Sequence, residues 1–276
     1  MNNFLKRTLS GIVFGVVMLA ALLTDRLVFG AVMLFALVVM MSEFIKMTCG
    51  NEYKFSQVLS ILAGAVLFVL TYLYKGFNMP GRFVALALIP VFVLMINSLY
   101  VKDKSHYSKF ASLYAALVYV AVPWSLLNFA AFDAAGEFNG ILLLCFFGII
   151  WGSDVGAYIF GMSLGQKYGR KLCPSISPKK SWIGFWGGLL VAVLVSAGLH
   201  YAGLFKFDLV HCIAMAVVLN VMGVYGDLIE SQWKRHYEIK DSGNLIPGHG
   251  GLLDRFDSAL VAIPTGIIYL VVMNVL

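Results

Sequence analysis

Charged side chains and glycines gather in one segment near the C-terminus, residues 226–257, whereas the rest of the chain is mainly apolar. The acidic residues of this segment are Asp227, Glu230, Glu238, Asp241, Asp254 and Asp257. The basic residues among them are Lys234, Arg235, Lys240 and Arg255. Carboxylates that face each other across a loop can hold Mg²⁺, and nearby cations neutralise phosphate groups. The segment therefore predicts a site for a charged, phosphate-bearing substrate.

The acids and bases follow helical spacing on both sides of a glycine-rich loop. The residues that would share a helix face are Asp227, Glu230, Ser231 and Lys234 before the loop, and Asp254, Asp257 and Ser258 after it. Residues 247–251, P-G-H-G-G, would let backbone N–H groups come close to phosphate. Asp227 and Asp254 are the expected pair of Mg²⁺ ligands. The alternative is that these side chains only cap helices and form salt bridges.

A second segment with polar residues precedes this one, from Asp154 to Gly184. Asp154 follows an apolar run, and a carboxylate at bilayer depth costs about 2.5–3.5 kcal/mol on insertion scales, which favours a functional role. The residues expected to contact substrate are Asp154, Tyr158, Ser177, Lys179, Lys180, Ser181 and, from the C-terminal segment, Ser231. For the two lysines, the alternative is attraction to the lipid surface and a role in topology.

The composition indicates an all-α, polytopic integral membrane protein. Of the 276 residues, 61% are hydrophobic and only 12% are charged, and the mean hydropathy is +0.87. A soluble domain carries about 25% charged residues, so this chain cannot cover a globular surface with polar groups. Apolar runs long enough for a helix to cross a bilayer recur along the chain. The expected spans are residues 8–24, 27–46, 56–74, 83–101, 110–130, 139–162, 182–204, 209–229 and 258–276.

Basic residues predict the orientation of these spans. With about nine spans, the N-terminus and the even-numbered loops hold 16 of the 20 lysines and arginines, so they are expected in the cytoplasm. We therefore expect a single membrane domain, with N-terminal spans in residues 1–138 and catalytic spans in 139–276. The polar loops 163–181 and 230–257 then share the cytoplasmic face of the cell (inner) membrane, and the active site faces the cytoplasm.

Several patterns are absent from the sequence. The four cysteines form no C-x-x-C pair, so neither a zinc site nor a disulfide framework is indicated. There is no P-loop, no G-x-G-x-x-G and no H-E-x-x-H pattern. Among the histidines, only His249 lies in a charged glycine loop, and it is the one we expect at the site.

At these residues the sequence resembles the phosphatidate cytidylyltransferases, also called CDP-diacylglycerol synthases. The resemblance lies in Ser231-x-x-Lys234-Arg235, Lys240-Asp241, residues 247–251 (P-G-H-G-G) and Asp254-Arg255-x-Asp257. The S-D-V-G-A-Y and S-P-K-K-S-W segments upstream are also similar to the family, so that residues 150–260 resemble it strongly and the earlier spans only in general character. One departure is Ile183, where the family usually has a glutamate.

The resemblance implies transfer of CMP from CTP to phosphatidate, which releases pyrophosphate and makes CDP-diacylglycerol for phospholipid biosynthesis. It also implies dependence on Mg²⁺ and a homodimer among membrane lipids, and no nucleic-acid partner is expected. The catalytic residues that it suggests are Lys234, Arg235, Lys240, Asp241, His249, Arg255 and Asp257. The basic ones would contact phosphates, and Asp241 and Asp257 would position them or the metal-bound waters.

Three other functions deserve comparison. A CTP-dependent lipid kinase would attack the γ- instead of the α-phosphorus and would release CDP. A secondary transporter would place its charges at the bilayer midplane between repeats, whereas here they lie at the ends of the expected spans and no repeat is visible. A non-catalytic membrane scaffold would not need the pattern of acids around a glycine loop.

Overall fold

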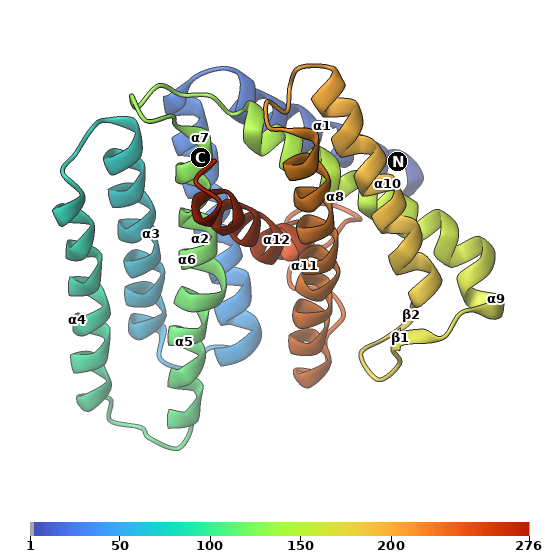
Figure 1. Ribbon diagram of the computed structural model, residues 1–276. Coiled ribbons are helices and arrows are strands. Elements are labelled where there is room, and N and C mark those ends of the chain that lie inside the picture. Colours follow the sequence, from blue (N-terminus) through green and yellow to red (C-terminus); the bar gives the residue numbers. More distant parts are fainter. Residues whose placement is uncertain (1–2, 276) are drawn as a thin grey trace. The chain divides into compact units, whose positions relative to one another are not determined.

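The computed structural model describes residues 3–275, without the side chains of residues 3, 4 and 6, and it is largely helical (Figure 1). The helices of the N-terminal half are α1 (Asn3–Leu23), α2 (Arg26–Cys49), α3 (Lys54–Gly76), η1 (Gly81–Ala87), α4 (Leu88–Leu99), η2 (Tyr107–Lys109), α5 (Phe110–Ala116), η3 (Leu117–Ala121), α6 (Val122–Ser125) and α7 (Leu127–Ala131). The rest comprises α8 (Ile141–Phe160), η4 (Gly161–Gly165), α9 (Gln166–Tyr168), β1 (Lys171–Cys173), β2 (Ser177–Ser181), α10 (Trp182–Tyr201), α11 (Leu209–His236) and α12 (Leu253–Val272).

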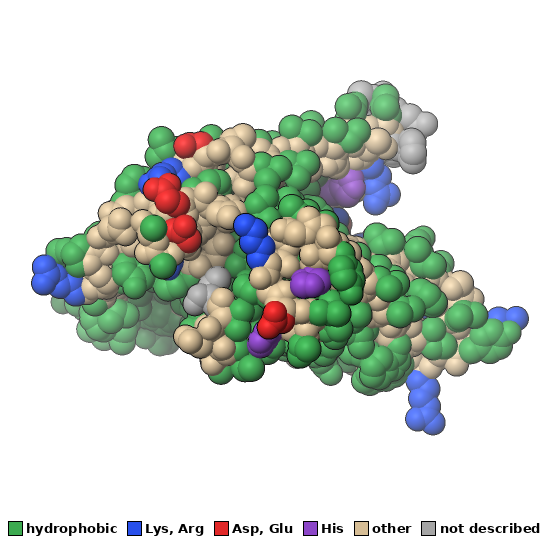
Figure 2. Space-filling model, turned by 45° about the horizontal axis from the view of Figure 1, so that its top comes forward, with side chains coloured by type: hydrophobic (Ala, Val, Ile, Leu, Met, Phe, Trp, Pro, Cys, Tyr) green, Lys and Arg blue, Asp and Glu red, His purple; other side chains and the backbone are tan. Residues whose placement is uncertain are grey.

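The predicted all-α membrane architecture is confirmed. Within the described chain, eight helices are long and apolar enough to cross a membrane, and Arg7–Leu23 of α1 is a shorter apolar helix. Many large apolar side chains on these helices are exposed, as a lipid-facing surface requires. Figure 2 shows hydrophobic side chains over most of one face, with charged side chains in a few small groups.

Several boundaries differ from the sequence prediction. The helices extend through Tyr168 and through His236, so the loops 163–181 and 230–257 are shorter than expected. Residues 230–234 lie on a helix, as their spacing predicted. α12 begins at Leu253, five residues before the predicted span. The helices continue because a polar helix end satisfies its own backbone once it leaves the apolar region, and hydropathy detects only the apolar part.

The described residues form two compact units. Of the described residues, the first contains 3–139 and 241–255, and the second contains 140–240 and 256–275, so that the start of α12 belongs to the first unit and the rest to the second. In the first unit, α2 packs on α3 and α5, and α3 packs on α4. Fully buried residues of α2, Phe29, Met33, Leu37, Met40 and Phe44, recur at helical spacing and form the centre of this unit.

In the second unit, α8, α10 and α11 pack against one another. Glycines allow close contact there: a Cβ at Gly156 of α8 would lie 2.8 Å from the carbonyl oxygen of Gly187 in α10. A buried hydrogen bond of 2.7 Å from the Ser153 hydroxyl to Asn220 Oδ1 joins α8 to α11. β1 and β2 form an antiparallel hairpin in which Lys171 pairs with Ser181, and this hairpin leads directly into α10.

Candidate active site

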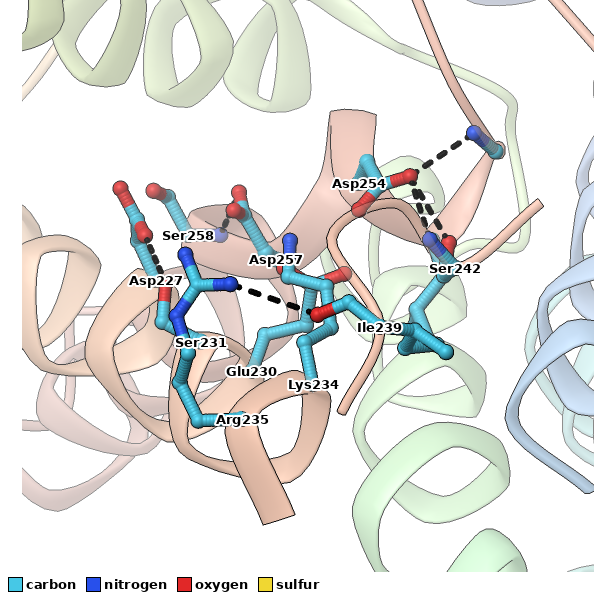
Figure 3. A network of polar contacts seen from close by, with 12 residues as sticks. Asp227, Glu230, Ser231, Lys234, Arg235, Ile239, Ser242, Asp254, Asp257 and Ser258 are labelled. Carbon is cyan, nitrogen blue, oxygen red and sulfur yellow. Dashed lines mark hydrogen bonds and ion pairs between the residues drawn. The ribbon is translucent and has the colours of Figure 1, made fainter. Parts of the chain in front are cut away.

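The cytoplasmic end predicted for α11 carries the expected stripe of polar residues (Figure 3). The Ser231 hydroxyl donates to Asp227 Oδ1 over 3.1 Å, one helical turn away. Lys234 forms an ion pair with Glu230, also one turn away. The Glu230 side chain is 1% exposed and that of Lys234 is 11% exposed, so this ion pair is buried. A buried charge is stable only with such a partner, which makes this pair a fixed part of the helix.

Lys180 connects the hairpin to this stripe. Its Nζ lies 2.6 Å from Asp227 Oδ2, and it also donates to the carbonyl oxygen of Val224 over 3.4 Å. Successive residues of a strand point to opposite faces. Lys180 is accordingly half-buried against α11, whereas Lys179 is exposed. The two adjacent lysines of the sequence therefore have different surroundings.

α12 brings a third acid to the same place. A Cβ at Gly226 would lie 2.6 Å from the carbonyl oxygen of Asp257, so the absence of a side chain at Gly226 is what lets α11 and α12 come this close. Asp257 is half-buried and within electrostatic range of Asp227, Lys234 and Asp154. The backbone N–H of Ser258 donates to Asp257 Oδ1 over 2.6 Å. The second unit thus gathers acids and lysines from α8, β2, α11 and α12 in one cluster.

Other predicted residues of the second unit have different positions. Ser181 is buried and caps α10, because its hydroxyl accepts a hydrogen bond from the backbone N–H of Gly184 over 3.2 Å. Tyr158 is 69% exposed, one turn after Asp154 on α8. Ser177 opens β2, and Ile183, the residue that departs from the family pattern, is half-buried in the first turn of α10.

Two basic residues near the end of α11 are exposed. Arg235 donates from Nη1 to the carbonyl oxygen of Ile239 over 3.3 Å, a bond that helps to close the turn after the helix. Lys240 is the last residue of the second unit before the loop 241–255, and it is also exposed. Both side chains are therefore accessible to an anion. Arg235 would exchange its bond to the Ile239 carbonyl oxygen for a bond to the anion.

The loop before α12 belongs to the first unit and is organised by Asp254. Its Oδ2 accepts hydrogen bonds from Ser242 N over 2.9 Å, Ser242 Oγ over 3.0 Å and Gly251 N over 2.8 Å. Gly248 and Gly250 have φ of +78° and +84°, a region that favours glycine. The glycines of the loop therefore serve its turn geometry, and Asp254 joins the two ends of the loop.

His249 lies at the tip of this loop, next to α1. The Ser10 hydroxyl lies 3.0 Å from His249 Nδ1 and 3.0 Å from the carbonyl oxygen of Pro247. Burial, followed by the charges of Arg255 and Arg7, lowers the pKa of the His249 imidazole below its ordinary value. Neutral imidazole is thus favoured at the tip of the loop.

Asp241 and Arg255 flank the same loop. A Cβ at Gly250 would lie 2.7 Å from Asp254 Oδ2 and 3.4 Å from Asp241 Cβ, so Asp241 is close to the turn. Arg255 is near enough to His249 to influence its charge. The first unit thereby brings together Asp241, His249, Asp254 and Arg255, all of which are predicted site residues.

Comparison with known proteins assigns this arrangement to a family. The sequence pattern of the cytidylyltransferase family matches residues 5–273. This chain belongs to the cytidylyltransferase family. Among its curated relatives, the phosphatidate cytidylyltransferase of Bacillus subtilis (strain 168) is 31% identical over 266 residues, which cover 96% of each chain. That of Staphylococcus aureus (strain COL) is 32% identical over 258 residues, 94% of this chain and 95% of the relative. The family resemblance stated from residues 150–260 therefore extends over nearly the whole chain.

The carboxylates of the site are the candidate ligands for a metal ion. Among the described residues, no group of three or more His, Cys, Asp and Glu side chains is placed to hold a metal ion. Mg²⁺ usually takes only one or two carboxylates together with waters and substrate phosphates, so the chemistry of the available donors fits it. Asp227 and Asp254, the expected pair, belong to different units, and their assignment as joint ligands stays a prediction.

Two acids near the candidate site were left out of the predicted catalytic and binding residues. Glu230 was placed on the polar stripe, but its burial and its ion pair with Lys234 were not predicted. Glu43 of α2 accepts hydrogen bonds from the backbone N–H groups of Leu252 and Leu253. The signal that could have found Glu43 is a single acid in an otherwise apolar span, residues 27–46.

Proposed function

We propose that this protein transfers CMP from CTP to phosphatidate and produces CDP-diacylglycerol and pyrophosphate. The observation that carries this proposal is the cluster of Lys180, Asp227, Lys234 and Asp257 at the polar end of membrane helices. Phosphatidate cytidylyltransferases that match nearly the whole chain support the same substrates. A membrane enzyme is suited to this reaction because one substrate and the product are lipids.

The reaction requires charge neutralisation more than a strong base. An oxygen of the phosphatidate phosphate attacks the α-phosphorus of CTP, the new P–O bond forms, and the bond to the β-phosphate breaks to release pyrophosphate. A phosphomonoester has a second pKa of about 6, so the nucleophile is largely ionised at neutral pH. Lys180 and Lys234, with the exposed Arg235 and Lys240, supply positive charge against the repulsion between the two anions.

The proposal includes Mg²⁺. Asp227 and Asp254 are the carboxylates that would hold it, each with its position fixed by hydrogen bonds within its own unit. When bound, Mg²⁺ would neutralise phosphate charge and stabilise the departing pyrophosphate. Asp257 and Asp241 would orient the lysines, the arginines or the waters around these phosphates.

The protein is a multi-pass membrane protein, and we propose the cell (inner) membrane with the site on the cytoplasmic side. The distribution of lysine and arginine among the loops supports this orientation. A homodimer surrounded by membrane lipids is the assembly suggested by the family resemblance. The mass of the purified protein in detergent, after subtraction of the bound detergent, tests that assembly.

The activity is tested with purified protein, phosphatidate, Mg²⁺ and CTP labelled at the α-phosphate. We expect the label to enter a lipid, and we expect EDTA and the Asp254→Asn substitution to abolish this transfer. Label that stays out of lipid, with folded protein and an active control enzyme, contradicts the proposal. CTP labelled at the γ-phosphate then distinguishes a lipid kinase, which would transfer that label to the lipid.

A further inference from the structure

A single carboxylate interrupts the apolar sequence of α2. Glu43 is the only acidic residue among residues 27–49, and its neighbours Met40, Met41, Phe44 and Ile45 are fully buried. A carboxylate in a membrane helix is costly unless it is well solvated by the protein. The hydrogen bonds that compensate for this cost indicate the role of the Glu43 carboxylate.

Both carboxylate oxygens of Glu43 accept hydrogen bonds from backbone N–H groups at the start of α12. Leu252 N donates to Oε1 over 3.1 Å, and Leu253 N donates to Oε2 over 2.8 Å. The first N–H groups of a helix have no partner within the helix, and an acid is stabilised there by the helix dipole. Glu43 therefore serves as a cap for α12 that is supplied by a residue about 210 positions earlier in the chain.

The same carboxylate reaches the other end of the loop through Ser242. The Ser242 hydroxyl lies 3.5 Å from Glu43 Oε2 and 3.0 Å from Asp254 Oδ2, and its one proton can serve only one of them at a time. Two glycines make room for this approach. A Cβ at Gly251 would lie 2.6 Å from Glu43 Oε2, and a Cβ at Gly243 would run into Glu43 Oε1.

The loop enclosed by these contacts, residues 241–255, carries four of the residues assigned to the site: Asp241, His249, Asp254 and Arg255. Asp254 joins the two ends of the loop from within. From α2, Glu43 holds the end at Leu252 and Leu253, and its Oε2 lies 3.5 Å from the Ser242 hydroxyl at the other end. Without Glu43, the N–H groups of Leu252 and Leu253 would lose their acceptor next to Asp254. The backbone that carries Asp254 and Arg255 would then no longer have one fixed position.

We propose that Glu43 is a positioning residue for nucleotidyl transfer, which acts by fixing the loop 241–255 and through it Asp254 and Arg255. This proposal rests on the proposed function for the identity of the reaction. The role of the carboxylate is to hold backbone N–H groups in place, so Glu43 itself touches neither substrate. Small displacements of catalytic groups reduce rates strongly, which makes the turnover number the sensitive quantity.

The test compares Glu43→Gln, Glu43→Asp and the matched control Glu52→Gln in the full-length protein. Gln keeps the size of the side chain but replaces one acceptor oxygen with an NH₂ group, which cannot accept from Leu252 or Leu253. Asp keeps the charge but is shorter by one methylene group. Glu52 is an acid of the same unit whose carboxylate lies 3.9 Å from His106 Nδ1, away from the loop.

The first measurement is transfer from α-labelled CTP to phosphatidate. We expect kcat to fall by about 10- to 100-fold in Glu43→Gln, with a smaller fall in Glu43→Asp, a change of less than about 3-fold in KM for CTP and no change in Glu52→Gln. The second is hydrogen–deuterium exchange of the purified protein. Exchange should become faster in peptides that cover residues 241–253 but not in those from α3 or α10.

The results distinguish failure of the positioning role of Glu43 from failure of the proposed function. Normal kcat and unchanged exchange of the loop in folded Glu43→Gln overturn the positioning role, and so does a loss of protection spread evenly over all helices. If Glu43→Gln does not fold, Glu43→Asp decides by the same two measurements. If the wild-type protein forms no CDP-lipid, the proposed function is wrong, and exchange still shows whether Glu43 holds the loop.

Discussion

Individual residues of the candidate site are distinguished by their partners more than by their types. Lys179 and Lys180 are adjacent in sequence, yet only Lys180 contacts Asp227. Lys234 is buried in an ion pair, whereas Lys240 is exposed. Because a side chain that already faces a carboxylate is held in one direction, Lys180 is the cation best placed to meet a phosphate beside Asp227.

Replacement of Lys180 by methionine should separate activity from stability. The ion pair with Asp227 is partly exposed, and such pairs contribute about 0–1 kcal/mol, so we expect little change in thermal stability. We expect CMP transfer to fall by about 100-fold or more, since a cation that faces the phosphates is lost. The initial rate of lipid labelling measures the activity, and a melting curve in the same detergent measures the thermal stability.

Lys171→Met is the matched control for this substitution. Lys171 is a lysine of the same hairpin, but its Nζ donates to Gln166 Oε1 over 2.7 Å and it lies away from Asp227. Its replacement should leave the rate within about 2-fold. Equal losses in both variants would indicate a role for the total charge of the hairpin and would contradict a specific role for Lys180.

His249 should make the protein less stable in mild acid. Burial, Arg255 and Arg7 lower its pKa from the ordinary value of 6.5, so the unfolded chain takes up this proton at a higher pH than the folded protein does. The free energy of unfolding should therefore fall as the pH drops below about 6.5, and this contribution should level off below the folded pKa. His249→Gln should remove this part of the pH dependence.

The measurement is the melting temperature of each protein between pH 7.5 and 5. The difference between wild type and His249→Gln should grow in favour of the variant as the pH falls. His106→Gln, which replaces an exposed histidine of the same unit, provides the comparison. A difference that stays constant over this range would mean that His249 titrates as it does in the unfolded chain.

At the scale of elements, close helix packing fixes the cluster. α11 and α12 approach each other in the second unit at Gly226, where a Cβ would lie 2.6 Å from the carbonyl oxygen of Asp257 and 3.2 Å from Ser258 Cα. Asp227 follows directly on α11. The backbone of α12 cannot move aside as the end of a flexible side chain could, so a methyl group at this position must displace one of the two helices.

Gly226→Ala should therefore impair both stability and activity. Overpacking of a core costs about 1–3 kcal/mol, and the displacement separates Asp227 from Asp257, so transfer should fall by about 10-fold or more. Gly198→Ala in α10 is the control, because a Cβ there meets no atom within 4 Å. Full activity of Gly226→Ala with unchanged melting would show that this helix contact does not matter for the site.

The sequence predicted the helices and the candidate residues better than their partners. Long apolar runs identify spans because a bilayer demands both length and apolarity. The hairpin 171–181 was expected only as a loop, since its strands are short and polar and have no alternating apolar pattern. The contacts of Glu43 with the loop, and of Lys180 with Asp227, join residues 210 and 47 positions apart, and no local pattern encodes such pairs.

At the scale of the whole molecule, residues close together near the C-terminus are divided between the two compact units. Residues 241–255 form a compact unit with the N-terminal helices, whereas α11 and α12 from Phe256 onward belong to the other unit. The predicted division into N-terminal spans (1–138) and catalytic spans (139–276) treats the first half as a support. Ser10 contacts His249, and Glu43 contacts Leu252 and Leu253, so the N-terminal helices directly contact the loop that carries site residues.

The orientation in the membrane is the prediction that concerns the entire chain. If the N-terminus and the even-numbered loops are cytoplasmic, the hairpin 171–181 and the loop 241–252 lie inside, and the turn at residues 132–139 lies outside. The described structure supplies a native reporter, Cys173 in β1, which is partly exposed, whereas Cys49, Cys145 and Cys212 are buried. Ala135, exposed in the turn 132–139, is a suitable position for a second cysteine.

A maleimide that cannot cross the inner membrane tests this topology in intact cells. The outer layers of these cells must let the reagent through. Ala135→Cys in a Cys173→Ser background should react in intact cells, whereas the native Cys173 should react only after lysis. The Cys173→Ser protein without Ala135→Cys should stay unlabelled in both conditions, because its remaining cysteines are buried. Labelling of Cys173 in intact cells would place the hairpin, and with it Lys180 next to Asp227, outside the cytoplasm. CTP is a cytoplasmic nucleotide, so that result would contradict the orientation and the proposed use of CTP together.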